Sequence, residues 1–241
     1  MNILNAIRQT PLNYLPEVSL TALELFESGY RHRCRQQGHS VEDDLGGNWR
    51  QFDAWIRERF GVGPSHFHVI SIVRSFSAND YEAFHNYFSL RDEFLKLYPA
   101  QSEAPNPALS VKCSNLIELL QSIRERPAMY VGIISFRRCC LYLMGDERAY
   151  KDLGLTLGED RHIFSDFKLW VQEKKNKAYL PRPWYAIISY YGTGGDCGHT
   201  NTGAFALFYD WLDEFASEIG KPELFQVAES WWQRQNRQSQ T

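Results

Sequence analysis

The strongest constraint on the fold is an internal repeat, because two diverged copies of one unit must satisfy the same packing twice. Residues 3–29 align without a gap to residues 119–145, and 8 of these 27 positions are identical. Two more blocks repeat in the same order: Phe52 and Trp55 with Phe167 and Trp170, and residues 83–94 with residues 204–215. Three matching blocks in one order indicate that a unit of roughly a hundred residues has been duplicated.

The repeat divides the chain into two copies, a connection and an extension. The copies span residues 1–99 and 115–218. Residues 100–114 contain prolines and small polar residues, which is typical of a linker. Residues 219–241 follow the second copy, and their apolar spacing predicts an additional amphipathic helix that ends in a polar tail.

The apolar spacing within each copy predicts a mainly α fold made of two tandem helical repeats. Each copy opens with a short helix, and a loop with Pro11 or Pro127 follows, because proline disfavours helix at the residue before it. Ser19 and Ser135 are expected in the first turn of the next helix or as its N-cap. A third helix carries Trp55 or Trp170, and a fourth ends each copy.

One segment of each copy is open to two interpretations, at residues 66–74 and 184–191. Both stretches are rich in β-branched and aromatic residues, which favours a short strand. The less hydrophobic positions, however, recur every three to four residues, as a buried helix requires. A helix is therefore favoured over a strand.

Composition argues for a cytoplasmic protein that does not bind nucleic acid or membranes. The formal net charge is −3, whereas nucleic-acid-binding domains usually present a basic face. No apolar stretch is long enough to span a bilayer, and the first residues do not resemble a signal peptide. The five cysteines include no CxxC pair and are expected to be reduced.

The best candidate for catalysis is the glycine-rich loop at residues 192–201. Asp196, Cys197 and His199 lie close together there, as a thiol nucleophile with a nearby base or a partial metal site would require. A metal site needs about four ligands, and no second cluster completes this one. A connector that leads into the next helix is the favoured interpretation, so no catalytic residue, cofactor or metal is predicted.

Two other groups have structural interpretations that are favoured over functional ones. His66 and His68 would share a face only on a strand, and no further ligand stands at a suitable spacing. Arg8 and Arg124 recur in both copies and could bind a phosphate. A repeated arginine beside a repeated proline and tyrosine is better explained as a clamp that caps carbonyls or stacks on a ring.

The second copy contains an RPxMYxG element, followed by a Phe-x-x-Trp helix and by a helix that ends in Asp-Glu-Phe. The residues are Arg126, Pro127, Met129, Tyr130, Gly132, Phe167, Trp170, Asp213, Glu214 and Phe215. This order resembles bacterial immunity proteins of polymorphic-toxin and type VI secretion systems. The first copy has a degraded form with Pro11, Tyr14, Phe52 and Trp55, without the Arg, Met and Gly.

The resemblance implies a cytoplasmic antitoxin that binds a cognate toxin one to one, the narrower candidate being a restriction-endonuclease-like DNase. Because nuclease clefts are basic, acidic residues are the expected contacts. These candidates are Glu42, Asp43, Asp44, Glu159 and Asp160, together with Asp196 and His199 of the glycine-rich loop. Two alternatives remain, a thiol-dependent enzyme that uses Cys197 and His199, and a helical scaffold that binds another protein.

Overall fold

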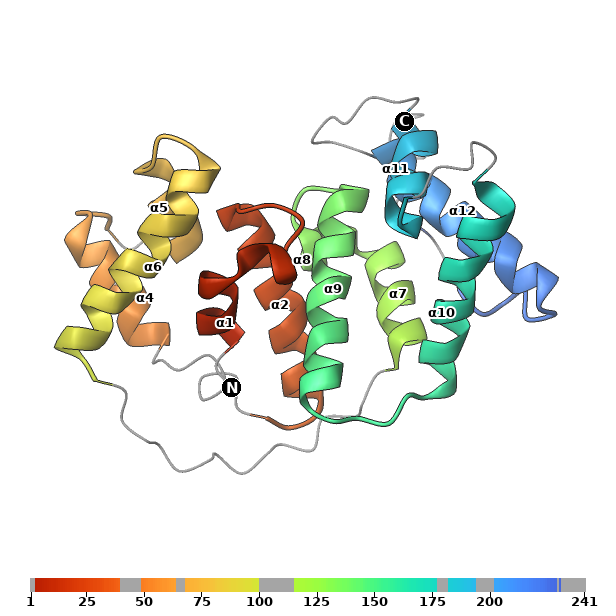
Figure 1. Ribbon diagram of the computed structural model, residues 1–241, viewed down its shortest axis with the longest axis horizontal. Coiled ribbons are helices and arrows are strands. Elements are labelled where there is room, and N and C mark those ends of the chain that lie inside the picture. The colour runs from red at the N-terminus through yellow and green to blue at the C-terminus, as the bar shows by residue number, and fades with distance from the viewer. Residues whose placement is uncertain are drawn as a thin grey trace. The chain divides into compact units, whose positions relative to one another are not determined.

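The computed structural model of the chain describes residues 3–39, 49–63, 68–99, 115–176, 182–193, 202–228 and 230. Every regular element within these ranges is a helix (Figure 1), so the prediction of a mainly α fold is confirmed and the optional short strand is absent from them. The chain forms two compact units. Unit 1 comprises Met1–Lys112 and Leu143–Leu153, and unit 2 comprises Cys113–Tyr142 and Gly154–Thr241.

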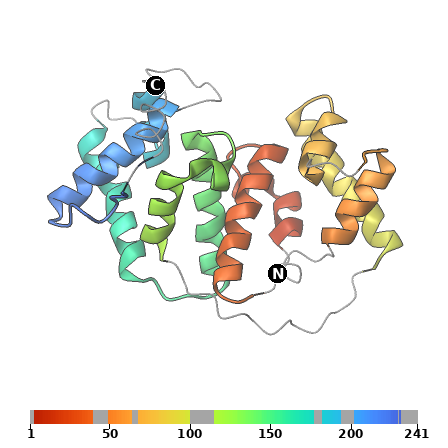
Figure 2. The ribbon, with the colours of Figure 1, turned by 180° about the vertical axis from the view of Figure 1, so that it is seen from behind.

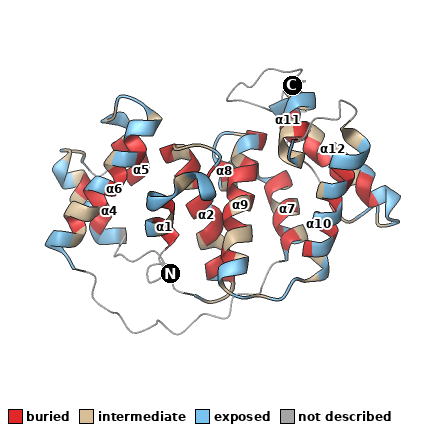
Figure 3. Cartoon of the chain, viewed as in Figure 1, coloured by how far each residue is buried: buried red, intermediate tan, exposed pale blue. Residues whose placement is uncertain are grey.

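Unit 1 places a small set of helices around an aromatic core. Its helices are α1 (Ile3–Gln9), the 3-10 turn η1 (Pro11–Asn13), α2 (Leu20–Gln36), α4 (Trp49–Arg59), α5 (Val69–Ser75) and α6 (Asp80–Leu97). Helix α6 packs on α2, α4 and α5. One face of α6 is buried (Figure 3) and carries Phe84, Tyr87 and Phe88. Phe52 of α4 joins this core, since its ring centroid lies 6.1 Å from that of Tyr87.

Unit 2 is also built from helices. Its helices are α7 (Leu116–Glu125), α8 (Pro127–Val131), the first part of α9 (Phe136–Asp152), α10 (Glu159–Trp170), the π-helical turn η2 (Val171–Lys175), α11 (Trp184–Thr193) and α12 (Thr202–Glu218). Helix α12 packs on both α10 and α11, as the two views show (Figures 1 and 2). Phe205, Phe208 and Tyr209 of α12 are completely buried.

Helix α9 contributes to both units, with residues 136–142 in unit 2 and residues 143–152 in unit 1. Within unit 1, Gly145 lies against the backbone of α2, where a Cβ added to it would come within 1.9 Å of the Phe26 carbonyl oxygen. One residue further on, Asp146 accepts a hydrogen bond from Arg33 Nε at 2.9 Å, and both side chains are buried. The close approach and the buried ion pair attach this part of α9 to α2.

Two predictions about individual segments can be compared with the structure. Residues 69–74 and 184–191 of the two ambiguous segments are helical, in α5 and α11, so the preference for helix over strand is confirmed for them, whereas residues 66 and 67 lie outside the described residues. The prediction of a helix after residue 218 is wrong for residues 219–228, which the structure describes and which contain no helix. Residues 222–225 form turns, and Gln226 N donates to Glu223 O at 3.1 Å. Phe225 does not form part of a helix face but is completely buried in the core.

The two units contain matching side-chain contacts at the repeated positions. The Phe52 and Trp55 rings stack with centroids 6.2 Å apart, and those of Phe167 and Trp170 stack at 6.1 Å. Each tryptophan also meets the last aromatic residue of the fourth-helix block, Phe94 at 5.8 Å or Phe215 at 5.9 Å. These paired geometries support the interpretation that the copies descend from one unit.

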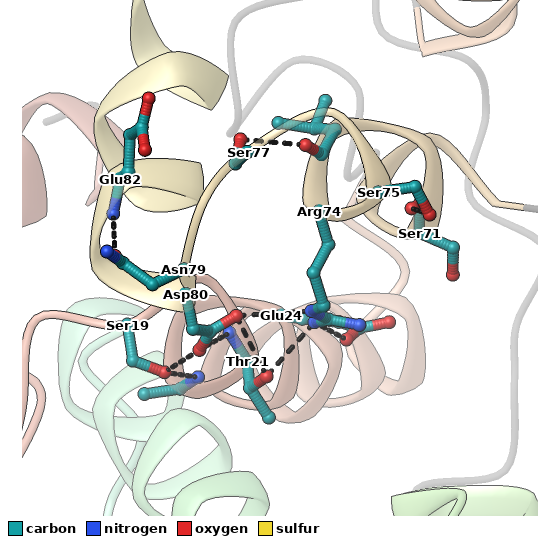
Figure 4. Close-up of polar contacts among 12 residues, drawn as sticks. Ser19, Thr21, Glu24, Ser71, Arg74, Ser75, Ser77, Asn79, Asp80 and Glu82 are labelled. Atoms are coloured by element: carbon teal, nitrogen blue, oxygen red, sulfur yellow. Dashed lines mark hydrogen bonds and ion pairs between the residues drawn. The ribbon is translucent and has the colours of Figure 1, made fainter.

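A polar network fixes the start of α2 in unit 1 (Figure 4). Ser19 caps α2 by accepting a hydrogen bond from Ala22 N at 3.1 Å, and its hydroxyl donates to the Asp80 carboxylate. Asp80 also accepts from Thr21 N at 3.1 Å and from Arg74 Nε at 3.1 Å. One carboxylate therefore stabilises the N-terminus of α2 and stands in the first turn of α6, where helix dipoles favour a negative charge.

This network predicts an acid-sensitive contribution to stability. Burial raises the pKa of Asp80, but the bonds from Ser19, Thr21 and Arg74 outweigh it, and the net pKa lies below the ordinary value of 3.8. A lowered pKa stabilises the fold above the unfolded-state pKa, and this contribution is lost as the pH falls toward the folded-state pKa. We expect Asp80→Asn to cost about 1–2 kcal/mol at pH 7.

The corresponding measurement compares the urea midpoints of Asp80→Asn and the wild-type chain between pH 7 and pH 3. The gap between the two proteins should narrow in the acid part of this range, where the Asp80 carboxylate becomes protonated more readily in the unfolded wild-type chain than in the folded one. A gap that stays constant down to pH 3 would show that the charge of Asp80 does not contribute.

Candidate functional site

The acidic residues predicted to bind a partner separate into two groups. Glu42, Asp43 and Asp44, and also Asp196, Cys197 and His199 of the glycine-rich loop, lie outside the described residues. Glu159 and Asp160 form the first turn of α10. Asp160 has a structural role, because its Oδ2 accepts a hydrogen bond from Leu116 N, at the start of α7, at 2.6 Å.

Glu159 remains a surface residue. Its side chain is 77% exposed, and Lys221 Nζ lies 2.6 Å from its carboxylate. The hydrogen bond and the charge of Lys221 lower the pKa of Glu159, so the carboxylate is ionised at neutral pH. An exposed pair of this kind contributes little to stability and is available to a charged partner.

The motif residues of the second copy mostly build local structure. Pro127 is the first residue of α8 and is buried, as its lack of an N–H allows at that position. The Tyr130 ring meets that of Tyr142 edge to face at 5.8 Å, and in the first copy Tyr14 meets Phe26 at 6.4 Å. Gly132 has φ of +67°, a conformation that side chains disfavour. Folding requirements therefore explain why these residue types stand in the motif.

Two members of the motif point outward instead. Arg126 and Met129 are both exposed, and Met129 is among the most exposed large apolar side chains of unit 2. The motif therefore combines a structural part with a small exposed part. A single exposed methionine is ordinary on a protein surface and carries no binding argument by itself.

A group of exposed aromatic side chains on α11 and α12 is the clearest candidate for a binding site. We name it the aromatic surface, and it consists of Tyr190, Tyr191 and Trp211. Tyr190 is 44% exposed and Tyr191 is 38% exposed, and Trp211 is partly exposed. The ring centroids of Tyr190 and Tyr191 are 5.4 Å apart, and those of Tyr191 and Trp211 are 6.0 Å apart.

Cations hold the aromatic surface in place. Lys175 Nζ of η2 lies 5.4 Å from the Trp211 ring centroid and 4.8 Å from that of Trp170, and it also binds both carboxylate oxygens of Glu214 at 2.6 Å. The Arg182 guanidinium lies 5.7 Å from the Tyr190 ring centroid. Such contacts orient rings that are open to solvent, so little side-chain entropy remains to be lost on binding.

Packing of α11 against α12 is what positions these rings. Gly192, directly after Tyr191, faces Ala204 of α12, and a Cβ added to Gly192 would lie 2.2 Å from Ala204 Cα. The two helices can therefore approach closely next to the contact between Tyr191 and Trp211. A larger residue at position 192 would separate the helices and disrupt the aromatic surface.

The sequence alone does not predict any residue of the aromatic surface as a binding residue. The apolar run at residues 184–191 predicts a buried segment, which would place the tyrosines at its end in the core. A signal is nevertheless present, because the tyrosine pair borders the glycine-rich loop, which the first copy replaces with a shorter segment. Trp211 aligns with Leu90 of the first copy, which is buried.

The repeated arginines form clamps, as expected, but their partner is the last helix of each copy. Arg8 Nη1 binds Asp92 at 2.7 Å, and Arg124 binds Asp213 through two nitrogens at 2.8 and 2.6 Å. Asp92 and Asp213 are thus structural ligands of arginine.

Comparison of the chain with protein-family models, with curated proteins and with solved structures gave no significant match. In the ranges that the structure describes, no three or more His, Cys, Asp or Glu side chains are grouped so that they could hold a metal ion. No helix in these ranges has both the length and the apolar character needed to cross a membrane.

The adjacent thiols of α9, Cys139 and Cys140, are predicted to be unreactive while unit 2 is folded. Both are buried, and burial raises the pKa of Cys139 to about 12 and raises the pKa of Cys140 as well. A rise of this size lowers the thiolate fraction about a thousandfold. We expect iodoacetamide to modify them at least about a hundredfold more slowly in native buffer than in urea, which peptide mapping by mass spectrometry would measure. Fast labelling in native buffer would contradict the burial.

Proposed function

We propose that the chain is an immunity protein that binds a cognate toxin in the cytoplasm and neutralises it by masking, in a one-to-one complex. The observation that carries this proposal is the aromatic surface, in which the exposed Tyr190 and Tyr191 rings contact each other and Tyr191 contacts the partly exposed Trp211. The resemblance of the RPxMYxG element to immunity proteins supplies the class of partner. A restriction-endonuclease-like DNase is the narrower candidate.

The physical chemistry of protein interfaces favours this use of the aromatic surface. Tyrosine, tryptophan and arginine dominate the residues whose loss weakens binding most, because they bury a large area with few rotatable bonds. Isolated exposed aromatic residues are common, but here the Tyr191 ring contacts both the Tyr190 ring and the Trp211 ring, so the three form a row of adjacent rings. Carboxylates such as Glu159 and Glu214 are exposed on the same unit and would assist association with a basic partner.

The test of the function uses the protein encoded by the neighbouring gene as the probe. Co-expression of that protein with the full chain should restore growth, and the two chains should co-purify at equal stoichiometry. The purified chain should abolish the activity of the partner at a one-to-one ratio. If the neighbouring protein is toxic and the chain neither rescues growth nor co-purifies with it, the proposal is wrong.

Substitutions in the aromatic surface should weaken this complex strongly. We expect Trp211→Ala to cost about 2 kcal/mol or more of binding free energy, which is roughly a thirtyfold rise in Kd, and Tyr191→Ala to have a similar effect. The matched control is Tyr81→Ala, which removes an exposed tyrosine from α6 in unit 1. Isothermal titration calorimetry would measure all three. Equal affinities for the three variants and the wild-type chain would remove the aromatic surface from the interface.

A further inference from the structure

The C-terminal segment, residues 219–228, occupies a docking site in unit 2. Gln121 Nε2 of α7 donates to Leu224 O at 3.0 Å, and Arg124 Nη1 donates to Phe225 O at 2.7 Å. The Phe225 side chain is completely buried. Unit 2 thus recognises a short turn through two consecutive backbone carbonyls and one aromatic side chain.

The residues that hold Arg124 in this site recur in unit 1. Arg124 binds Asp213, and its guanidinium lies 5.2 Å from the Tyr209 ring centroid. At the aligned positions, Arg8 binds Asp92, and its guanidinium lies 5.8 Å from the Phe88 ring centroid (alignment of residues 3–29 with 119–145 and of 83–94 with 204–215). An arginine, an aspartate and an aromatic ring are therefore assembled on α1 and α6 as well, with Phe88 in place of Tyr209.

Arg124 and Arg8 differ in their exposure to solvent and in their hydrogen bonds. The Arg124 side chain is 9% exposed, whereas the Arg8 side chain is 43% exposed. Both nitrogens of the Arg124 fork bind Asp213, and Nη1 in addition takes the Phe225 carbonyl. Among the described residues, the hydrogen bonds of Arg8 involve Nη1 alone. Unit 1 thus presents an oriented guanidinium with donor capacity at the position where unit 2 binds a carbonyl.

We propose that α1 and α6 of unit 1 form a second peptide-docking site, which takes a turn segment with an aromatic side chain and a backbone carbonyl directed at Arg8. This assignment of the occupant rests on the proposed function, under which the segment is a surface loop of the toxin. The turn bound in unit 2 supports such an occupant, because Arg124, the counterpart of Arg8, donates to a backbone carbonyl of that turn beside a buried Phe225. A hydrogen bond from a charged donor to a carbonyl is stronger than one between neutral groups. Arg8 would therefore contribute substantially to the affinity for the segment.

The first experiment titrates the full chain with a fluorescein-labelled peptide of sequence IGKPELFQVA, the segment at residues 219–228. Fluorescence anisotropy should show saturable binding at one site. The Arg8→Ala variant should bind the peptide about tenfold more weakly or worse, because one charge-assisted hydrogen bond is lost. A peptide with alanine in place of the phenylalanine should lose affinity to a similar degree.

The control variant is Arg59→Ala, which removes an ion pair of closely matched geometry. Arg59 binds Glu93 at 2.6 Å with side-chain exposures of 43% and 44%, and it also lies over an aromatic ring. The control should bind the peptide as the wild-type chain does. The proposal is overturned if the wild-type chain does not bind the peptide, or if Arg8→Ala and Arg59→Ala bind it equally well.

The second experiment repeats the comparison with the neighbouring gene product. A rise in Kd of about tenfold for Arg8→Ala, with no change for Arg59→Ala, would identify the toxin as the occupant. If both variants bind the toxin as the wild-type chain does, the docking proposal fails for this partner while the proposed function stands. If the wild-type chain does not bind the toxin, the proposed function and the assignment of the occupant fail, and the peptide titration still decides whether the site exists.

Discussion

A Gly145→Val substitution is expected to destabilise unit 1 by about 3 kcal/mol or more. A Cβ at this position would lie 1.9 Å from the Phe26 carbonyl oxygen and 2.9 Å from Tyr30 N. Both atoms belong to the backbone of α2, so no side-chain rotation can relieve the overlap. The helices would have to separate, and the hydrogen bond between Arg33 and Asp146 beside the crossing would be stretched.

The Gly145→Ala variant makes this test sharper, because helix propensity alone would raise the free energy of unfolding, whereas the overlap should lower it. Within a helix, glycine to alanine ordinarily stabilises by about 0.5–1 kcal/mol. At Gly145 the added methyl group alone produces the overlap, so Gly145→Ala should also destabilise the chain. The control is Gly63→Ala, where an added Cβ meets nothing within 4 Å. Urea denaturation followed by circular dichroism would compare the three variants, and a stabilised Gly145→Ala would refute the close approach.

Much of the fold could be predicted because its signals are local. Helical spacing of apolar residues identifies the helices that carry Trp55 and Trp170, and it also favours helix in the ambiguous segments, which are α5 and α11. The N-cap role of Ser19 follows from its side chain and the helix directly after it. The alignment of the copies also shows which aromatic residues and arginines occupy corresponding places.

The features that sequence reasoning missed depend on contacts between distant residues. The sequence indicates a surface carboxylate at Asp160, but Asp160 accepts a hydrogen bond at the start of a helix that begins 44 residues earlier, at Leu116. Asp80 completes the cap of α2 from 61 residues away. The packing of α12 on α11 determines which face of α11 is exposed. The composition of residues 184–191 does not predict this packing. The sequence places the tyrosine pair beside the glycine-rich loop, but only the structure shows that these rings are exposed.

The buried ion pair between Arg33 and Asp146 leads to the second large prediction. The Arg33 and Asp146 side chains are 3% and 0% exposed, and Nε lies 2.9 Å from Oδ1. The Arg33 guanidinium also lies 5.7 Å from the Tyr150 ring centroid. Asp146→Ala removes the carboxylate and leaves the positive charge of Arg33 in a position with little access to water. We expect a loss of about 3–5 kcal/mol in the free energy of unfolding.

Two comparisons separate this effect from the loss of an ordinary ion pair. Asp92→Ala removes the same side chain from the more exposed pair with Arg8, and it should cost less than about 1 kcal/mol. The double variant Arg33→Met with Asp146→Leu should be more stable than Asp146→Ala, because it removes both buried charges and keeps the volume filled.

Cysteine labelling can show where each variant opens. Cys34 of α2 is buried in unit 1, and Cys139 and Cys140 are buried in unit 2. If Arg33 and Asp146 stabilise unit 1, Asp146→Ala should expose Cys34 at a lower urea concentration than Cys139 and Cys140. Peptide mapping after iodoacetamide treatment would resolve the two regions. Simultaneous labelling of all three thiols at an unchanged midpoint would contradict the prediction, because removal of Asp146 would then leave no destabilising buried charge at Arg33.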